Sequence, residues 1–597
     1  MGMTRLGMYE GGKGNGMVQQ IEAAGSTQVD LDRSVEELQA HKDAWARLSV
    51  DRKIAYLSGM RDRTAAAAGR WVADALAAKG IPPGSPLAGE EWTSGPWALL
   101  FALNRLILSL EGIARGGVPV LKPGTVRTRP DGQVVVDVFP NTLYDRLLVS
   151  GVTGEVWMQP GVTPDNLPGH MAAFYKQSHP EGRVALVLGA GNISSIPPLD
   201  VLYKLYAEGQ VCLLKLNPVN DYLGASFEQV FADLIADGYV RLAYGGADVG
   251  SYLCGHRGVE TIHMTGSERT HDAIVFGPGE AGAARKRLKE PLLDKPITSE
   301  LGNVSPTIVL PGPWSEADLR FQAEHIATQK MHNGGFNCIA AQVLVLPGEW
   351  DRTPDLLRQV EDTLHETPRR PEYYPGAAQR QQAFVEQHPE ATLLDSPADG
   401  VVPRTLIPDV DPSRRDDICF RSEAFTDVLT ATRLPGADAA AFLSRAVAFC
   451  NDTLRGTLGA NIIVHPATAK ELGPALDEAI AALRYGCVGV NAWTGVGFLL
   501  APTSWGAYPG HTLEDVGSGI GVVHNTYLFD RPQKSVIRAP FYPFPRGVAH
   551  GQLSMLPKPP WFITNKQAHN VGRRLTRFEA KPSPLKLPGI FADALRG

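Results

Sequence analysis

The clearest structural signal in the chain is an alternation of short apolar runs with amphipathic segments between residues 182 and 264. Each apolar run holds about five residues and is bounded by glycine, proline or charged positions, which is typical of strands buried in a parallel sheet. The segments between them carry helical periodicity, and proline opens one of them at Pro197. Because strands that alternate with helices place the helices on the sheet faces, the pattern predicts an α/β fold. The four runs lie at 184–188, 211–215, 240–244 and 260–264.

A second alternating region runs from about 306 to 495, and the segments around these two regions differ in character. Residues 28–115 are predicted to be mostly helical, and a β-rich run at 133–139 follows the turn Pro130-Asp131-Gly132. The resulting domain prediction is a flexible tail at 1–27, a cofactor-binding domain at 28–305 with a β hairpin at 117–160, a catalytic domain at 306–495, a closing or oligomerisation segment at 496–540, and a Pro-rich basic extension at 541–597 that wraps the surface.

Composition and charge exclude several classes of protein. The 597 residues carry 57 basic and 63 acidic side chains, so the net charge of −6 gives no support for nucleic-acid binding. Six cysteines without a CxxC pair are no disulfide framework and predict no metal site, and reduced thiols are the default in the cytoplasm. The longest apolar stretch, 97–114, is interrupted by Asn104 and Arg105, so a buried helix is expected there and no membrane span.

Four short segments carry candidate chemistry. Gly189-Ala-Gly191 lies between a strand and a helix, where backbone N–H groups can meet a phosphate, but a plain turn is equally consistent with it. Cys338 follows a Gly-Gly turn, and a thiolate on such a loop adds readily to a carbonyl carbon, whereas the other five cysteines suit buried apolar positions. Glu300 and Glu423 are each open to interpretation as a functional carboxylate or as an exposed strand-end residue.

Taken together, these segments occur in a recognisable order, and between about 150 and 540 the chain resembles the aldehyde dehydrogenase superfamily. The most specific element is Glu300-Leu-Gly followed 38 residues later by Cys338 in Asn-Gly-Gly-Phe-Asn-Cys. The other matching pieces are Leu188-Gly-Ala-Gly-Asn-Ile, Leu214-Lys-Leu-Asn-Pro, Met264-Thr-Gly-Ser, Glu423-Ala-Phe-Thr-Asp-Val and Val488-Gly-Val-Asn.

The resemblance implies a subunit with a parallel-sheet cofactor domain, a catalytic domain and a small β oligomerisation element. It implies Cys338 as nucleophile, Glu300 as the base that activates a hydrolytic water, and Asn192 with the Cys338 N–H as the oxyanion hole. It implies NAD or NADP as cofactor. The matching cofactor residues are Lys215 at the adenosine ribose, Gly266 and Ser267 at the helix start under the pyrophosphate, Glu423 at the nicotinamide ribose, Phe425 beside the nicotinamide, and Gly191 in the first glycine loop.

Several positions depart from the family pattern. Gly191 and Ser194 stand where an aromatic residue and a proline are usual, which makes this loop resemble the fatty acyl-CoA reductases of the same superfamily. Phe336 replaces a glutamine, and His271 replaces a glycine of the phosphate turn. Pro218 stands where NAD-preferring members often carry a glutamate, so the cofactor preference stays open between NAD and NADP.

The sequence therefore predicts oxidation of a small-molecule aldehyde to a carboxylic acid by a cytoplasmic homodimer or homotetramer. Three alternatives remain: an acylating, coenzyme A-dependent enzyme or acyl-CoA reductase, against which Glu300 argues; a cysteine hydrolase or acyltransferase that pairs Cys338 with His332; and a silent scaffold. Trp493, Phe498, Phe336 and Trp505 are candidates for an apolar substrate tunnel, although packing is the commoner role of such residues.

Overall fold

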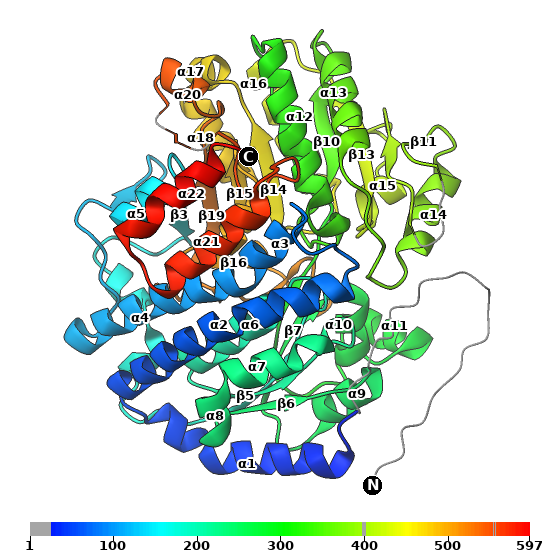
Figure 1. Cartoon of the computed structure of the whole chain (residues 1–597). Coiled ribbons are helices and arrows are strands. Elements are labelled where there is room, and N and C mark those ends of the chain that lie inside the picture. The colour runs from blue at the N-terminus through cyan, green and yellow to red at the C-terminus, as the bar shows by residue number, and fades with distance from the viewer. Residues whose placement is uncertain (1–24, 397–400, 553, 556) are drawn as a thin grey trace.

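A computed structural model describes residues 25–396, 401–552, 554, 555 and 557–597. Most of the predicted flexible tail, residues 1–24, lies outside the described residues. The first described segment is held in place, since the Ser26 N–H donates to the Tyr244 carbonyl at 3.0 Å and Thr27 caps the first helix. Figure 1 shows the chain divided into a lower half built mainly from the first 300 residues and an upper half built mainly from later ones.

The lower half is built on a six-stranded sheet that confirms the predicted parallel order. β4, β5, β6, β7 and β8 are mutually parallel and only the short β17 is antiparallel. The strands β4 and β5 are buried over almost every residue, as expected for a sheet with both faces covered. The order across the sheet is β17 (Gly519–Ile520), β8 (Ile297–Leu301), β7 (Thr261–Gly266), β4 (Val184–Leu188), β5 (Val211–Lys215) and β6 (Val240–Ala243).

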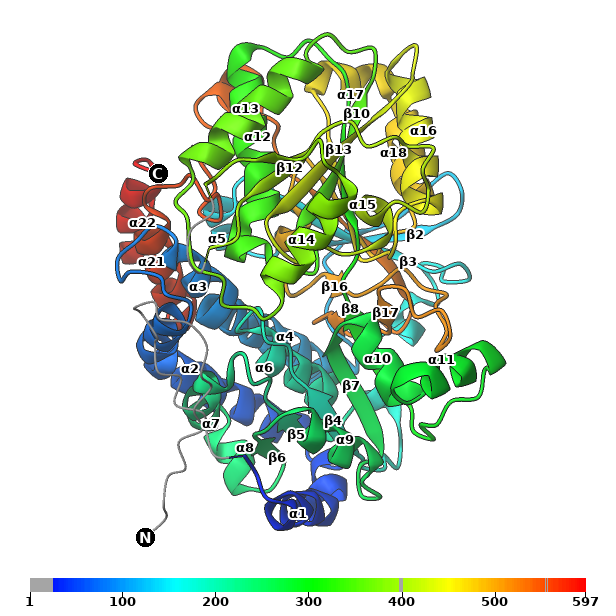
Figure 2. The ribbon, with the colours of Figure 1, turned by 90° about the vertical axis from the view of Figure 1, so that its right-hand side faces the viewer.

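The upper half is built on an eleven-stranded sheet whose central seven strands are parallel. Figure 2 shows β10, β12 and β13 in this half and β4 to β7 in the other. The order is β1 (Val126–Thr128), β2 (Val134–Phe139), β3 (Thr153–Met158), β19 (Pro532–Arg538), β15 (Cys487–Val490), β14 (Gly459–Ile463), β9 (Ser305–Val309), β10 (Ala341–Pro347), β13 (Val428–Leu434), β12 (Thr405–Ile407) and β11 (Thr392–Leu393). A two-stranded sheet joins β16 (Ser504–Trp505) to β18 (Val523–His524).

The predicted β hairpin at 117–160 joins the upper sheet. Its strands β2 and β3 pair with each other, and β3 pairs antiparallel with β19 from the end of the chain. This differs from the predicted placement of the hairpin in the first domain. The reason is that its pairing partner lies nearly 400 residues away, where no local pattern could indicate it.

Residues 28–116 are mostly helical, as predicted. The apolar stretch forms one buried unit with a π-helical turn at Thr93–Trp97, where Pro96 interrupts the regular hydrogen bonds. By length and composition the span Ala88–Gly116 could cross a membrane, but 72% of its apolar window is buried among the described residues. The helices are α1 (Gln28–Ala46), α2 (Val50–Ala78), α3 (Ala88–Trp92) and α4 (Ala98–Gly116).

The remaining helices cover the two sheets. Those of the lower half and the hairpin are α5 (Leu143–Leu148), α6 (Ile196–Leu202), α7 (Gly224–Val230), α8 (Ala232–Ala236), α9 (Ala247–Gly255), α10 (Glu268–Val275) and α11 (Gly279–Leu288). Those of the upper half are α12 (Glu316–Met331), α13 (Thr353–Glu366), α14 (Ala377–Gln387), α15 (Ile418–Arg421), α16 (Ala439–Asp452), α17 (Pro466–Leu472), α18 (Pro474–Ala482) and α19 (Thr494–Leu499).

The C-terminal extension is more than the predicted surface wrap. It forms α20 (Arg546–Ala549), α21 (Ala568–Ala580) and α22 (Leu587–Ala594), and α21 packs against α3 and α4 (Figure 1). Val571, Leu575 and Phe578 of α21 belong to the main hydrophobic core. A helix with an apolar stripe is stable once that stripe is buried. The Pro-rich composition of residues 541–597 as a whole does not reveal this short amphipathic helix.

Candidate active site

A cleft of about 1870 Å³ opens at the carboxyl ends of β4, β5 and β7 and extends to Cys338. Ligand sites of open parallel sheets lie at this edge, because the strand-to-helix loops there converge. All nine residues singled out from the sequence line this cleft: Gly191, Asn192, Lys215, Gly266, Ser267, Glu300, Cys338, Glu423 and Phe425.

Cys338 and Glu300 are in direct contact. Glu300 lies near the end of β8 and Cys338 on the turn after α12, and the Cys338 Sγ donates to Glu300 Oε1 at 3.3 Å. Glu300 is 2% exposed, and its other carboxylate oxygen has no hydrogen-bond partner among the described residues. Burial, with the Asp200 carboxylate nearby, raises the pKa of Glu300 to about 7. A carboxylate with such a pKa can accept a proton near neutral pH.

The surroundings of the Cys338 thiol disfavour its ionised form. Burial raises the pKa of this thiol well above its usual value, and the carboxylates of Glu300 and Glu423 add to the effect. The nucleophilic form of a cysteine is the thiolate, so a base or a positive charge would have to act on Cys338 before it could attack. Glu300 is the carboxylate in contact with it.

The amide of Asn192 is aimed at the turn that carries Cys338. Its Nδ2 donates to the Phe336 carbonyl at 3.0 Å, and its second N–H, which has no acceptor among the described residues, is available to an oxyanion. Asn333, in the left-handed region with φ 57°, donates to the same carbonyl at 3.0 Å. Two side-chain amides thus fix the backbone two residues before the nucleophile.

Two buried ion pairs contact this turn through Asn333, and the sequence did not predict them. Lys79 Nζ contacts Glu91 at 2.7 Å and Asn333 Oδ1 at 3.0 Å. Arg370 binds the Glu90 carboxylate through two bonds of 2.8 and 2.9 Å, and Glu90 also accepts from the Asn333 N–H at 3.0 Å. Burial alone would raise the pKa of Glu90, but Arg370 holds it below its usual value. The signal in the sequence for these buried ion pairs was the occurrence of two adjacent acidic residues, Glu90 and Glu91, in an apolar stretch.

Glu423 reaches the cleft over Gly302, the glycine of the Glu-Leu-Gly segment. Burial raises the pKa of Glu423 to about 8, against the opposing influence of the cations Lys330 and Arg380. Arg380, which sequence reasoning also missed, lines the cleft and donates to the carbonyls of Ala424 and Phe425 at 3.0 Å. It therefore fixes the loop that carries both predicted cofactor residues.

Phe425 belongs to an aromatic cluster beside the nucleophile turn. Its ring centroid lies 5.0 Å from that of Tyr374 and 5.9 Å from that of Phe336. Phe336 also packs against Tyr373, whose hydroxyl donates to the Asn192 carbonyl at 3.0 Å. Phe336 therefore belongs to this packing cluster and does not line the small cavity described below, which corrects its assignment to a substrate tunnel.

The far end of the cleft suits a dinucleotide. A Cβ at Gly191 would lie 2.8 Å from Asn217 and 2.9 Å from Val219, so glycine is needed where these two loops meet. Ser267 caps α10 by accepting from the Thr270 N–H at 3.2 Å, and the helix N-terminus opens on the cleft beside Gly266. Free N–H groups at such a terminus bind phosphate oxygens. These residues fit the pyrophosphate of NAD or NADP.

Lys215 ends β5 at the same end of the cleft. Burial lowers its pKa, and the carboxylates of Asp248 and Asp221 act in the opposite direction. Pro218 carries no charge. A ribose 2′-phosphate at this end of the cleft would be attracted by the Lys215 cation and repelled by the carboxylates of Asp221 and Asp248. The geometry agrees with the open choice of cofactor.

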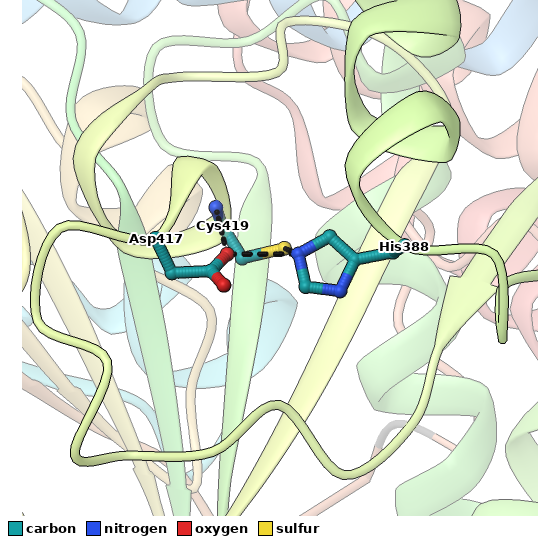
Figure 3. A group of neighbouring side chains, drawn as sticks. All are labelled: His388, Asp417 and Cys419. Carbon is teal, nitrogen blue, oxygen red and sulfur yellow. Dashed lines mark hydrogen bonds and ion pairs between the residues drawn. The ribbon is translucent and has the colours of Figure 1, made fainter.

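A buried cluster of His388, Asp417 and Cys419 stabilises the segment that leads into Glu423. The His388 Nε2 lies 2.8 Å from Asp417 Oδ1 and 3.4 Å from the Cys419 Sγ (Figure 3). His388 Nδ1 bonds Glu390 at 2.8 Å, and Asp417 accepts from the Cys419 N–H at 3.0 Å. Three ligand atoms of these residues lie close enough to share a metal ion. Their hydrogen bonds to one another account for the grouping, and they fix α15, which leads directly into Glu423.

The histidine next to the nucleophile turn does not form a catalytic dyad. Both ring nitrogens of His332 are buried without a partner among the described residues, and its ring packs on Trp493 at 4.8 Å. Burial lowers the pKa of His332. The contact of Cys338 is Glu300, so the structure does not favour a cysteine hydrolase that pairs Cys338 with His332.

A second, smaller cavity of about 370 Å³ also reaches Cys338. Trp493, Phe498 and Trp505, three of the candidates for an apolar tunnel, line it together with His332 and Ile193. Cys338 thus lies between a large cleft that holds the predicted cofactor residues and a small aromatic cavity.

The model of the aldehyde dehydrogenase family matches residues 180–498, and the chain belongs to this family. It is 24% identical over 337 residues to an N-succinylglutamate 5-semialdehyde dehydrogenase of Ectopseudomonas mendocina, covering 55% of this chain and 54% of that protein. It is 27% identical over 225 residues to a coniferyl aldehyde dehydrogenase of a Pseudomonas strain, covering 35% and 42%. The chain thus spans about half the length, or less, of these curated relatives.

Solved structures share the fold over a larger part of this chain than the curated relatives match in sequence. An aldehyde dehydrogenase of Mycobacterium tuberculosis complexed with NAD+ superposes with a TM-score of 0.58 at 17% identity, covering 86% of this chain and 91% of that one. A mutant aldehyde dehydrogenase of Pseudomonas syringae in complex with NAD+ and octanal gives 0.55 at 17% identity, covering 87% and 90%. Both confirm the predicted α/β architecture.

Proposed function

We propose that the protein oxidises an aldehyde to a carboxylic acid through Cys338, with NAD or NADP as the hydride acceptor. The observation that carries the proposal is the 3.3 Å contact between the Cys338 Sγ and Glu300, at the meeting point of a dinucleotide cleft and an apolar cavity. Membership of the aldehyde dehydrogenase family supports it.

The first half of the reaction uses the two side chains in contact. Glu300 takes the thiol proton, and the Cys338 sulfur attacks the aldehyde carbon, so that one C–S bond forms and the carbonyl oxygen becomes an oxyanion. The free N–H of Asn192 and the Cys338 backbone N–H stabilise this oxyanion. A nicotinamide cofactor held by the residues of the cleft would supply the acceptor for the hydride of the aldehyde carbon, and Cys338 would then carry a thioester.

The second half releases the acid. Glu300 first passes the thiol proton to the solvent and then takes a proton from a water molecule, which attacks the thioester carbon and breaks the C–S bond. The departing sulfur recovers a proton from Glu300. The products are the carboxylic acid and the free thiol. A pKa of about 7 lets Glu300 alternate between proton acceptor and donor at neutral pH.

Two further properties belong to the same proposal. Six cysteines without a disulfide support a cytoplasmic location. Strand β1 is an outer edge of the eleven-stranded sheet, and the backbone groups on the open side of an edge strand can pair with a second copy, which supports assembly into a homodimer or homotetramer.

The test is incubation of the full chain with NAD or NADP and a panel of aldehydes, with absorbance of the reduced cofactor as readout. Release of the carboxylic acid without coenzyme A supports hydrolysis. A strict need for coenzyme A would instead support the acylating alternative, against which the buried Glu300 argues.

A further inference from the structure

Buried polar atoms without partners lie beside the small cavity that reaches Cys338. His332 and Trp493 both line this cavity. The His332 side chain is 2% exposed, and neither of its ring nitrogens has a hydrogen-bond partner in the part of the chain that the structure describes. The Trp493 indole N–H has no acceptor among these residues either. Burying a polar atom unpaired costs free energy, and a ligand that pairs with these three atoms would recover it.

The position of His332 is fixed by contacts that do not use its ring nitrogens. His332 caps the C-terminal end of α12, and the Asn337 side chain donates to its backbone carbonyl at 2.7 Å. The imidazole packs on the Trp493 ring with a centroid distance of 4.8 Å. Backbone and ring are thus both held, and the two nitrogens remain available to a ligand in the cavity.

The imidazole of His332 is neutral at neutral pH. Burial lowers its pKa, and the nearby charges are those of the two buried ion pairs that contact the nucleophile turn, whose effects on His332 oppose each other. A neutral imidazole has one nitrogen that donates a hydrogen bond and one that accepts it. A hydroxyl group also donates and accepts, so it can pair with either nitrogen, whereas a carboxylate finds no cation in His332.

The rest of the cavity restricts the size and the charge of its ligand. The other walls are mainly apolar and include Ile193, Ile339 and Leu499, and no Lys, Arg, Asp or Glu of the described ranges lines the cavity. An ionised group would be buried there without a counter-charge. At about 370 Å³ the cavity is near the small end of the range for ligand pockets, so it suits a short molecule.

We infer that His332 recognises the hydroxyl group of a short, uncharged hydroxyaldehyde whose carbonyl carbon lies at the Cys338 sulfur. This inference rests on the proposed function and names its substrate class. Cys338 follows His332 by six positions and lines the same cavity, so one small molecule can contact both side chains. The Trp493 N–H is a second donor for the hydroxyl oxygen.

The test measures kcat/KM, referred to the free aldehyde, for pairs of aldehydes that differ only in a hydroxyl group. The pairs are glycolaldehyde with acetaldehyde and 3-hydroxypropanal with propanal. The wild type should prefer the hydroxylated member of at least one pair by about tenfold or more, because a site built to pair with a hydroxyl disfavours the analogue that lacks it. His332→Phe keeps an aromatic ring and removes both nitrogens, so this preference should disappear while oxidation of acetaldehyde and propanal continues.

Two controls accompany this comparison. His325→Phe changes another buried histidine of α12, one that lines neither the small cavity nor the large cleft, and it should keep the wild-type preference. Succinic semialdehyde carries a carboxylate and has as many carbons as butanal. The wild type should oxidise it at least about tenfold less efficiently than butanal, because its charge would be buried unpaired.

The outcomes separate this inference from the proposed function. A wild type that oxidises aldehydes without preferring the hydroxylated member of either pair, or that prefers succinic semialdehyde to butanal, overturns the assigned substrate class and leaves the proposed function standing. A full preference retained in His332→Phe overturns the role of His332. If that variant fails to fold, as judged by its melting temperature, the wild-type ratios decide alone. A wild type that reduces neither cofactor with any aldehyde overturns the proposed function, and this inference with it.

Discussion

The backbone of Gly302 lies against the carboxylate of Glu423 so closely that a Cβ at position 302 would be 2.1 Å from Glu423 Oε1. The two residues are 121 positions apart, and each stands in a segment by which the family resemblance was recognised. The glycine after Glu300-Leu301 is thus explained by the room that the Glu423 carboxylate needs.

Replacement of Gly302 by alanine should therefore displace Glu423. We expect the KM for the cofactor to rise at least tenfold and the free energy of unfolding to fall by about 1–3 kcal/mol, the usual cost of overpacking. Gly69→Ala is the control: nothing lies within 4 Å of a Cβ there, and this helical site should gain stability. Unchanged cofactor kinetics in Gly302→Ala would contradict the assigned role of Glu423.

The nucleophile assignment predicts that Cys338→Ala abolishes formation of reduced cofactor while binding of NAD or NADP stays measurable by calorimetry. The reason is that no C–S bond can form, whereas the residues that line the far end of the cleft are untouched. Cys450→Ala, which changes a buried cysteine outside the cleft, should keep its activity. Turnover retained in Cys338→Ala would end the proposed mechanism.

Glu300→Gln should slow both halves of the reaction. A glutamine can take neither the thiol proton nor the proton of the hydrolytic water, so we expect the burst of reduced cofactor to shrink and the steady-state rate to fall at least a hundredfold below that of the wild type. Stopped-flow absorbance measures both phases. A full burst followed by a slow steady state would show that Glu300 acts on the water alone.

The pKa of Glu300, about 7, predicts an acid limb in the pH profile of kcat/KM. The working form is the carboxylate, so the rate should rise with pH through about 7. Asp200 raises this pKa through its negative charge, so Asp200→Asn should shift the limb to lower pH. Asp452→Asn, at the surface in a pair with Arg484, should leave the limb in place. If the acid limb stays in place in Asp200→Asn, the limb reports a group other than Glu300.

The ribose site predicts that NADP is accepted beside NAD. Pro218 offers no carboxylate against a 2′-phosphate, and Lys215 can pair with it. Asp221 acts the other way, so Asp221→Asn should raise kcat/KM for NADP relative to NAD. A preference of the wild type for NAD above about a thousandfold, roughly 4 kcal/mol, would contradict dual use.

The sequence by itself determined the parallel sheet and the candidate residues that meet in one cleft. Strands such as 184–188 and 211–215 are recognisable because a strand buried on both faces is apolar at almost every position, which is a local property. Cys338, Glu300 and Asn192 were recognisable because their chemistry depends on residue type and on short segments whose order along the chain is preserved.

Only the tertiary structure decided what surrounds these groups. The ion pairs Lys79–Glu91 and Arg370–Glu90, the Arg380 contacts at 424 and 425, and the stacking of Phe562 on α12 join residues up to hundreds of positions apart. Such pairs have no periodicity and no fixed spacing, because they exist only once burial makes an unpaired charge costly or an empty space unfavourable. The raised pKa values of Glu300 and Cys338 have the same origin, since desolvation is a property of the folded interior and not of the chain.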